Sequence, residues 1–186
     1  NRFGNNYPVI CYVGRIQKAK RLDMLVESMV LLKNKYKMSV NLVIVGKESE
    51  DTGIADLVEK NNLADNVWFY GPCYEEAELG TIFYNSSVCV SPGNVGLTAI
   101  HSLTYGCPLI THNNFSNQMP EFEVITPCIT GDFFEENNID DLGRKIYEWL
   151  KIYPKSSDKL RSECYKVIDE KYNPHYQIEL FKKLIV

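Results

Sequence analysis

The sequence has little of what marks several large classes of protein. No apolar run approaches the roughly 18 residues that a membrane-spanning helix needs, and no secretory signal pattern is visible. Basic residues number 20 against 24 acidic ones, and they form no dominant cluster on a predicted face. We therefore expect neither a membrane span nor nucleic acid as a partner.

The six cysteines include no C-x-x-C pair and no spacing typical of a metal site, so we expect no bound metal. Cys11 and Cys89 lie inside apolar runs, where cysteine usually acts as a small hydrophobic residue. This pattern favours a reducing environment. We expect a cytoplasmic protein, either free or at the cytoplasmic surface of the membrane.

What the sequence does contain is a regular alternation of strand-like and helix-like segments. Short apolar runs predict strands at residues 8–14, 40–46, 66–71, 87–92 and 108–112. Helical spacing predicts helices between the strands and three more beyond residue 140, the last two near 155–171 and 174–185. This order indicates an α/β fold with a Rossmann-like, doubly wound parallel sheet and helices on both faces. A chain of 186 residues is expected to form a single domain.

In such a sheet, ligands bind beyond the carboxyl ends of the strands, at the loops that lead into helices. The first of these loops begins at Gly14 and has neither the P-loop pattern nor the glycine fingerprint of dinucleotide-binding folds. It also lacks the acidic residues that a receiver domain carries after its first strand. These three classes of protein are therefore excluded.

The first loop instead carries two well-placed cations. Arg15 and Lys20 stand five positions apart, just before a predicted helix. Two cations beside a helix N-terminus suit a polyanion such as a diphosphate. The alternative is a solvated basic loop without a ligand.

A second loop leads from the strand at 87–92 into a helix predicted at 95–106. Gly93 and Gly96 flank the turn, and small residues there let backbone amides approach an anion closely. The candidate donors are the amides of Asn94, Val95, Gly96, Leu97 and Thr98. The alternative is a tight strand-to-helix turn without a ligand.

The chain resembles a known family in several stretches, among them "YVGRIQKAKRLDMLVESM", "LVIVG" and "GLTAIHSLTYGCPLIT", taken in this order and spacing. The family is the GT-B glycosyltransferases of the glycosyltransferase family 4 type (glycosyl transferases group 1), and the similar part is their C-terminal, donor-binding domain. The resemblance runs from about residue 9 to about residue 150. The chain enters a strand almost at once and has no initiator Met. We therefore interpret residues 1–186 as a fragment without its N-terminal acceptor domain.

The resemblance assigns roles to particular residues. Arg15 and Lys20 would bind the donor diphosphate and stabilise it during transfer, which makes them the catalytic candidates, with Gly14 beside them. Tyr70 and Gly71 would lie at the nucleobase. Weaker candidates near the donor, with an ordinary surface position as the alternative, are Lys47, His112, Asn113 and Glu121. His175 is interpreted as a polar residue at the entry of a helix.

Two positions depart from the family pattern. Family members carry a Glu-x7-Glu pair, and its two positions align here with Gly93 and His101. In the family the first glutamate contacts the donor sugar and the second binds the ribose hydroxyls. Gly93 could contact the sugar only through its backbone or a water. His101 is a candidate for the ribose, and a satisfied core histidine is the alternative.

The sequence thus predicts a hexosyltransferase-type glycosyltransferase whose donor substrate is a UDP- or GDP-linked sugar, with no separate cofactor. The resemblance implies retention at the transferred sugar and a glycan or lipid-linked acceptor, as in polysaccharide biosynthesis. The isolated fragment is expected to be inactive. Loss of both glutamates leaves open a non-catalytic nucleotide-sugar-binding or regulatory subunit. A nucleotide-sugar epimerase of the same architecture is a third candidate.

Overall fold

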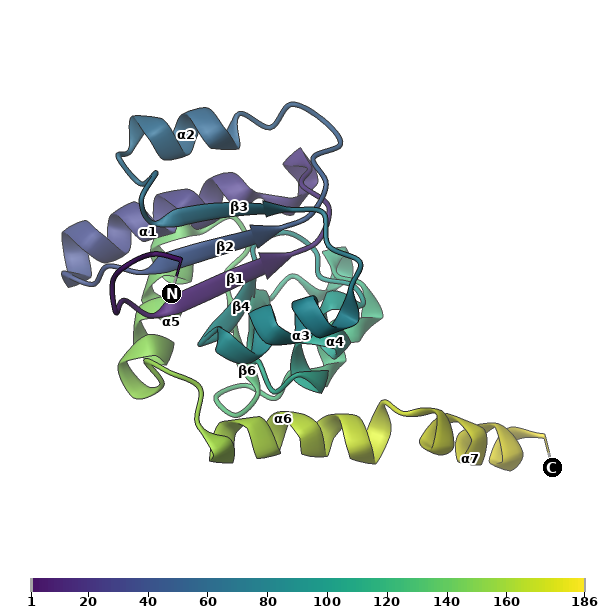
Figure 1. Cartoon of the computed structure of the whole chain (residues 1–186). Coiled ribbons are helices and arrows are strands. Elements are labelled where there is room, and N and C mark those ends of the chain that lie inside the picture. The colour runs from purple at the N-terminus through teal and green to yellow at the C-terminus, as the bar shows by residue number, and fades with distance from the viewer. Residues whose placement is uncertain (1, 186) are drawn as a thin grey trace.

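The computed structural model describes residues 2–185, which form a parallel six-stranded sheet with helices on both faces (Figure 1). The strands are β1 (Val9–Val13), β2 (Asn41–Val45), β3 (Val67–Gly71), β4 (Val88–Ser91), β5 (Leu109–His112) and β6 (Gly131–Phe134). The helices are α1 (Leu22–Tyr36), α2 (Ile54–Lys60), α3 (Glu76–Asn85), α4 (Thr98–Thr104), α5 (Ile139–Ile152), α6 (Asp158–Lys171) and α7 (Pro174–Leu184). Three short 3-10 helices are η1 (Lys18–Lys20), η2 (Phe115–Asn117) and η3 (Pro120–Val124). The predicted doubly wound α/β fold is confirmed.

The strand order β3-β2-β1-β4-β5-β6 explains where a ligand can bind. The chain adds β2 and β3 on one side of β1, then returns and places β4 on the other side. The loops after β1 and β4 therefore lead to helices on opposite faces of the sheet, at the point where the winding direction changes. Such a switch point leaves a crevice beyond the carboxyl ends of the two strands.

Two elements differ from the sequence prediction. The strand β6 was not predicted, because its four residues include a glycine and Asp132, whose carboxylate pairs with Lys145 at 2.8 Å. It nevertheless pairs in parallel with β5 and forms the edge of the sheet. Helix α4 is shorter than predicted, since it begins at Thr98 instead of residue 95.

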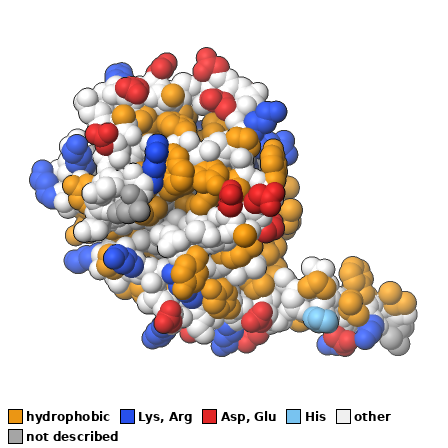
Figure 2. All heavy atoms as spheres, viewed as in Figure 1, with side chains coloured by type: hydrophobic (Ala, Val, Ile, Leu, Met, Phe, Trp, Pro, Cys, Tyr) orange, Lys and Arg blue, Asp and Glu red, His pale blue; other side chains and the backbone are white. Residues whose placement is uncertain are grey.

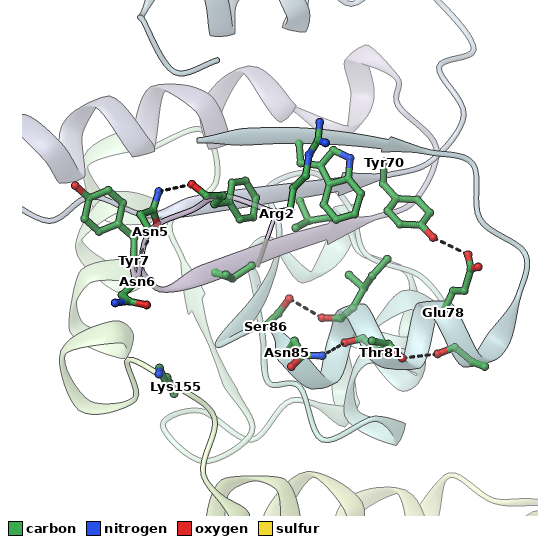
Figure 3. A pocket seen from close by; sticks show the side chains of 16 residues that line it. Arg2, Asn5, Asn6, Tyr7, Tyr70, Glu78, Thr81, Asn85, Ser86 and Lys155 are labelled. Carbon is green, nitrogen blue, oxygen red and sulfur yellow. Dashed lines mark hydrogen bonds between the residues drawn. The ribbon is translucent and has the colours of Figure 1, made fainter. Parts of the chain in front are cut away.

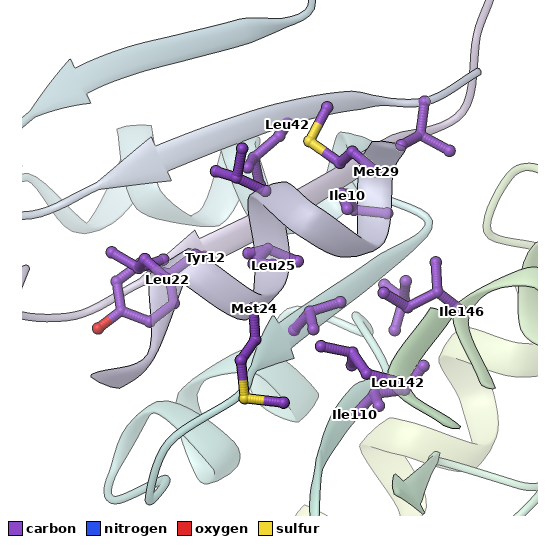
Figure 4. Packing of buried hydrophobic residues seen from close by; sticks show 14 of the residues in the cluster. Ile10, Tyr12, Leu22, Met24, Leu25, Met29, Leu42, Ile110, Leu142 and Ile146 are labelled. Atoms are coloured by element: carbon purple, nitrogen blue, oxygen red, sulfur yellow. The ribbon is translucent and has the colours of Figure 1, made fainter. Parts of the chain in front are cut away.

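The sheet separates two hydrophobic cores. One core lies under α1, α2 and α5 and includes Leu25, Met29 and Ile146 (Figure 4). The other lies under α3, α4 and α6 and includes Phe83 and Leu103. Burying each such side chain contributes about 1.5–3 kcal/mol. The core under α3, α4 and α6 also encloses Cys11, Cys89, Cys107 and Cys164. The predicted hydrophobic role of Cys11 and Cys89 is therefore confirmed.

The two C-terminal helices differ in how they pack. Helix α6 packs against α4, whereas α7 buries none of its described residues and projects away from the sheet (Figure 1). Hydrophobic side chains on α7, including Ile178 and Phe181, remain exposed (Figure 2). The predicted helices near 155–171 and 174–185 are confirmed. Over residues 2–185, none of the helices combines the length and apolar character that a bilayer crossing requires.

Candidate functional site

The structure brings the two predicted loops together at the switch point. Lys20 donates from Nζ to the backbone oxygen of Asn94 at 2.7 Å and to its side-chain Oδ1 at 2.6 Å. Partial burial and the nearby positive charge of Arg15 both lower the pKa of Lys20. Two cations that repel each other in a partly desolvated place favour the binding of an anion between them.

Arg15 itself presents its side chain to solvent. Within residues 2–185 its guanidinium forms no salt bridge, unlike those of Arg21 and Arg144. Its backbone is held in place, because the hydroxyl of the buried Tyr12 donates to the Arg15 carbonyl at 2.7 Å. The loop is thus anchored, and the charged end of Arg15 is available to a ligand.

Gly93 lies directly against the first loop. Its amide donates to the carbonyl of Lys20 at 3.0 Å. A Cβ atom at this position would lie 2.3 Å from the carbonyl oxygen of Ala19 and 2.7 Å from the Cα of Lys20. Since both obstacles are backbone atoms, only glycine fits here while the two loops stay in contact.

The next residues of the second loop differ in how far their amides are engaged. The Val95 amide donates to Oε1 of Gln118 at 2.7 Å, so it already has a partner within the protein. The amides of Gly96 and Leu97 donate to none of the described residues. The Leu97 side chain is 71% exposed, and the Thr98 hydroxyl donates to the carbonyl of Val13 at 3.1 Å.

His101 lies outside the core and contacts side chains of a neighbouring helix. Its Nε2 lies 2.9 Å from Oε2 of Glu76 in the first turn of α3, and the Tyr105 hydroxyl donates to the same oxygen at 2.9 Å. The ring packs edge-on against Phe83. Hydrogen bonds from His101 and Tyr105 lower the pKa of Glu76. A carboxylate from α3 therefore stands beside His101 of α4.

The nucleobase candidates lie at the end of β3. Gly71 accepts a hydrogen bond from the Gly46 amide at 3.0 Å, which ties the ends of β2 and β3 together. The Tyr70 hydroxyl donates to Glu78 of α3 at 2.6 Å, and this carboxylate raises the pKa of Tyr70 to about 12. The ring of Tyr70 thus faces the surface of the sheet beside α3, and only its backbone is near the end of the strand.

That surface holds a cavity of about 810 Å³ between β3 and α3 (Figure 3). Its walls include Trp68, Tyr70 and Ile82, and the guanidinium of Arg2 lies 5.4 Å from the centre of the Trp68 ring. Hydrophobic side chains gather over this part of the molecule (Figure 2). The cavity lies on the face of the sheet, whereas Lys20 and Asn94 lie beyond its carboxyl edge, so it does not belong to the same site.

The weaker candidates fall in different places. His112 is buried at the end of β5, and the backbone amide of Asn113 pairs with Phe134. Oε2 of Glu121 is buried and has no hydrogen-bond partner among the described residues. Lys47 and His175 are exposed. Over residues 2–185, no group of three histidine, cysteine or carboxylate side chains could hold a metal ion.

Comparison with known proteins identifies the family. A family model described as "Glycosyl transferases group 1" matches residues 1–167. The chain belongs to this family. Two curated relatives, both named D-inositol 3-phosphate glycosyltransferase, are 30% identical to it. The protein from Segniliparus rotundus matches over 109 residues (55% of this chain, 24% of the relative), and that from Gordonia bronchialis over 116 (56% and 25%). The chain thus spans about a quarter of the length of these relatives.

Several solved structures share the fold of this chain. The chain matches Staphylococcus aureus TarM, solved with fondaparinux, alpha-GlcNAc-glycerol and UDP, with a TM-score of 0.79 and 22% identity, over 97% of this chain and 36% of TarM. The lipopolysaccharide galactosyltransferase WaaB matches with a TM-score of 0.80 and 17% identity, over 96% of this chain and 49% of WaaB. The fold is therefore that of one half of a GT-B glycosyltransferase.

Three residues near the site were not predicted from the sequence: Glu76, Gln118 and Glu136. Glu76 has the pattern of an acid in the first turn of a helix, and its partner His101 lies 25 positions away. Gln118 and Glu136 lie in loops without regular periodicity. No signal in the sequence links these three residues to the two loops, because each comes close to them only through tertiary packing.

Proposed function

We propose that this chain binds a nucleoside-diphosphate sugar and serves as the donor-binding half of a hexosyltransferase. The observation that carries the proposal is the contact between Lys20 and Asn94, with Arg15 close enough to lower the pKa of Lys20. This contact joins two loops at a switch point, where α/β sheets bind their ligands. The family of the chain supports a transferase as the enzyme class.

In this proposal the two cations act on the leaving group. Negative charge grows on the diphosphate as the bond to the sugar breaks, and Arg15 and Lys20 are positioned to stabilise it without a metal ion. The amides of Gly96 and Leu97 would add two neutral donors beside them. The stabilisation is electrostatic and needs no reorganisation of these groups during the reaction.

The nucleoside would extend from the diphosphate toward β3. The backbone around Tyr70 and Gly71 would meet the base, and the His101–Glu76 pair would meet the ribose. Structures of other proteins with this fold contain UDP, which supports UDP as the first donor nucleotide to test, with GDP as the second. Retention, a glycan or lipid-linked acceptor, and an acceptor domain elsewhere in the polypeptide are further parts of the proposal.

The experiment is nucleotide binding measured by thermal shift with UDP, GDP, ADP and CMP. A nucleotide that binds only the folded chain raises its melting midpoint by mass action. Lys20→Ala should lose most of the shift, because it removes a charged partner of the diphosphate at a cost of about 1.5–3 kcal/mol. Lys18→Ala is the matched control, since Lys18 is an exposed lysine of the same loop. If no nucleotide shifts the native chain, or if both variants respond equally, the proposed site is wrong.

One observation favours a second candidate, a non-catalytic nucleotide-sugar-binding subunit. Position 93 cannot hold the family's first glutamate while Ala19 and Lys20 lie against it. Such a subunit would bind the donor in the same assay but would give no sugar transfer with any acceptor, even as part of the complete polypeptide. Nucleotide binding with transfer by the complete polypeptide excludes this candidate.

A further inference from the structure

A second, strongly polar pocket lies beside the proposed diphosphate site. It has a volume of about 330 Å³ and adjoins Gly93 and Asn94 on the side of β5 and β6. The polar side chains that line it are those of Arg21, Asn94, His112, Asn117, Glu136 and Asn137. Asn94 is shared by both sites, because its side chain also accepts the hydrogen bond from Lys20.

The carboxylate of Glu136 is held in a fixed position in this pocket. Asn114 donates to its Oε2 at 2.7 Å, and Asn117 donates to its Oε1 at 3.1 Å. These two bonds, together with the charges of His112 and Arg21, lower the pKa of Glu136. A carboxylate has about four acceptor positions. The ionised group therefore keeps acceptor capacity for a ligand.

His112 faces the same carboxylate without bonding to it. Its Nδ1 accepts a hydrogen bond from the Asn114 amide at 3.3 Å, which places the proton of the neutral ring on Nε2. Nε2 lies 4.0 Å from Oε1 of Glu136, beyond hydrogen-bond distance. A hydroxyl group can bridge two such atoms, because it accepts from Nε2–H and donates to the carboxylate.

The charges decide which ligand suits the pocket. A second phosphate would meet the negative charge of Glu136, while the guanidinium of Arg21 is already bonded to Asp23 and Asn137. An uncharged polyol meets no such repulsion and satisfies the carboxylate, the amides and the imidazole. A polyanion site and a polyol site that share Asn94 match the two ends of a sugar diphosphate.

We propose that this pocket binds the sugar of the donor and that Glu136, with His112, accepts and orients its hydroxyl groups. The inference rests on the proposed donor-binding function and names the residue that recognises the sugar. Glu136 thereby supplies a carboxylate that position 93 cannot carry. It is a specificity-determining residue that comes from the loop between β6 and α5.

The test compares nucleotides with and without the sugar, using UDP, UDP-glucose, UDP-N-acetylglucosamine, GDP and GDP-mannose in calorimetric titrations. Glu136→Gln keeps the shape of the side chain but removes its charge and one acceptor. It should weaken the binding of the preferred sugar nucleotide about tenfold, as expected for a lost hydrogen bond to a charged group. Binding of the nucleotide alone should stay unchanged, which also shows that the variant is folded.

Glu135→Gln is the matched control, because this neighbouring glutamate is exposed and does not line the pocket. It should bind all five ligands as the native chain does. The inference is overturned if Glu136→Gln binds the sugar nucleotide normally, or if it weakens nucleotide and sugar nucleotide equally. It is also overturned if the native chain binds the nucleotide but none of the sugar nucleotides. If neither nucleotide binds the native chain, the proposed function itself fails.

Discussion

His101 on α4 and His112 at the end of β5 each face a glutamate, but in different surroundings. The His101 side chain is 28% exposed and contacts Glu76 directly at 2.9 Å. The His112 side chain is only 3% exposed and stays 4.0 Å from Glu136. In the His101–Glu76 pair the Tyr105 hydroxyl donates to the same carboxylate oxygen, so the contact is complete without a ligand.

The His112–Glu136 pair, in which only the histidine is buried, is kept apart by its neighbours. The Asn114 amide fixes the ring of His112, and two asparagine side chains fix Glu136. Desolvation lowers the pKa of His112 despite the opposing effect of Glu136. Two polar groups that are held in place without meeting leave room for a ligand between them. A pair that is already hydrogen-bonded has less capacity left for a ligand. This difference makes the His112–Glu136 region the stronger candidate for sugar recognition.

The largest effect on stability is expected from a glutamate at position 93, which adjoins the His112–Glu136 region. Gly93→Glu should lower the free energy of unfolding by about 3 kcal/mol, because its Cβ would overlap the backbone of Ala19 and Lys20. Urea unfolding measures the loss. Gly96→Ala is the control, since the nearest atom to a Cβ at Gly96 is 4.0 Å away. A Gly93→Glu chain as stable as the native one would show that the fold can hold a carboxylate at this position.

A smaller effect on stability is expected from pH, through the buried His112. The pKa of His112 is lowered from 6.5, so the unfolded chain takes up a proton near pH 6.5 while the folded chain resists it. Stability should therefore fall as the pH drops below 6.5, by at most about 1.4 kcal/mol per pH unit. His112→Asn should reduce this decline between pH 6.5 and 5, as followed by urea unfolding at each pH. If His112→Asn declines as steeply as the native chain, His112 is not the group responsible.

The smallest effect is expected at the exposed pair. His101→Ala should weaken UDP binding about threefold, because a single exposed polar contact contributes no more than about 1 kcal/mol. Thr104→Ala on the same helix is the control, since its hydroxyl bonds only to the carbonyl of Ile100. Titration of UDP into both variants measures the difference. Unchanged affinity in His101→Ala would remove the ribose role from this residue.

Much of the fold could be predicted from the sequence because it depends on local pattern. Continuous apolar runs such as 40–46 mark strands buried on both faces, and β2 is indeed buried at all five of its residues. The strand β6 escaped prediction because an edge strand of four residues needs no continuous apolar run. The start of α4 was predicted three residues too early, and nothing near residue 95 in the sequence indicates that Gln118 engages the Val95 amide.

The site divides in the same way. The proximity of Arg15, Lys20 and Asn94 could be predicted from the sequence, because the ends of adjacent parallel strands must lie at one edge of the sheet. Glu76 and Glu136 could not, since each reaches its partner across helices or loops that are 24 or more positions apart. Their pairing depends on how α3 packs against α4 and how β6 pairs with β5.

The amino-acid sequence by itself determined the α/β fold, the family, the loop that carries Arg15 and Lys20 and the glycine-flanked loop at Asn94, because periodicity and loop position are local properties. Only the tertiary structure decided which carboxylates stand near those loops. It also showed that Gly93 must be glycine, since the backbone of a loop more than 70 residues earlier occupies the space of its side chain. Contacts of this kind arise from packing between distant segments, and no local pattern encodes them.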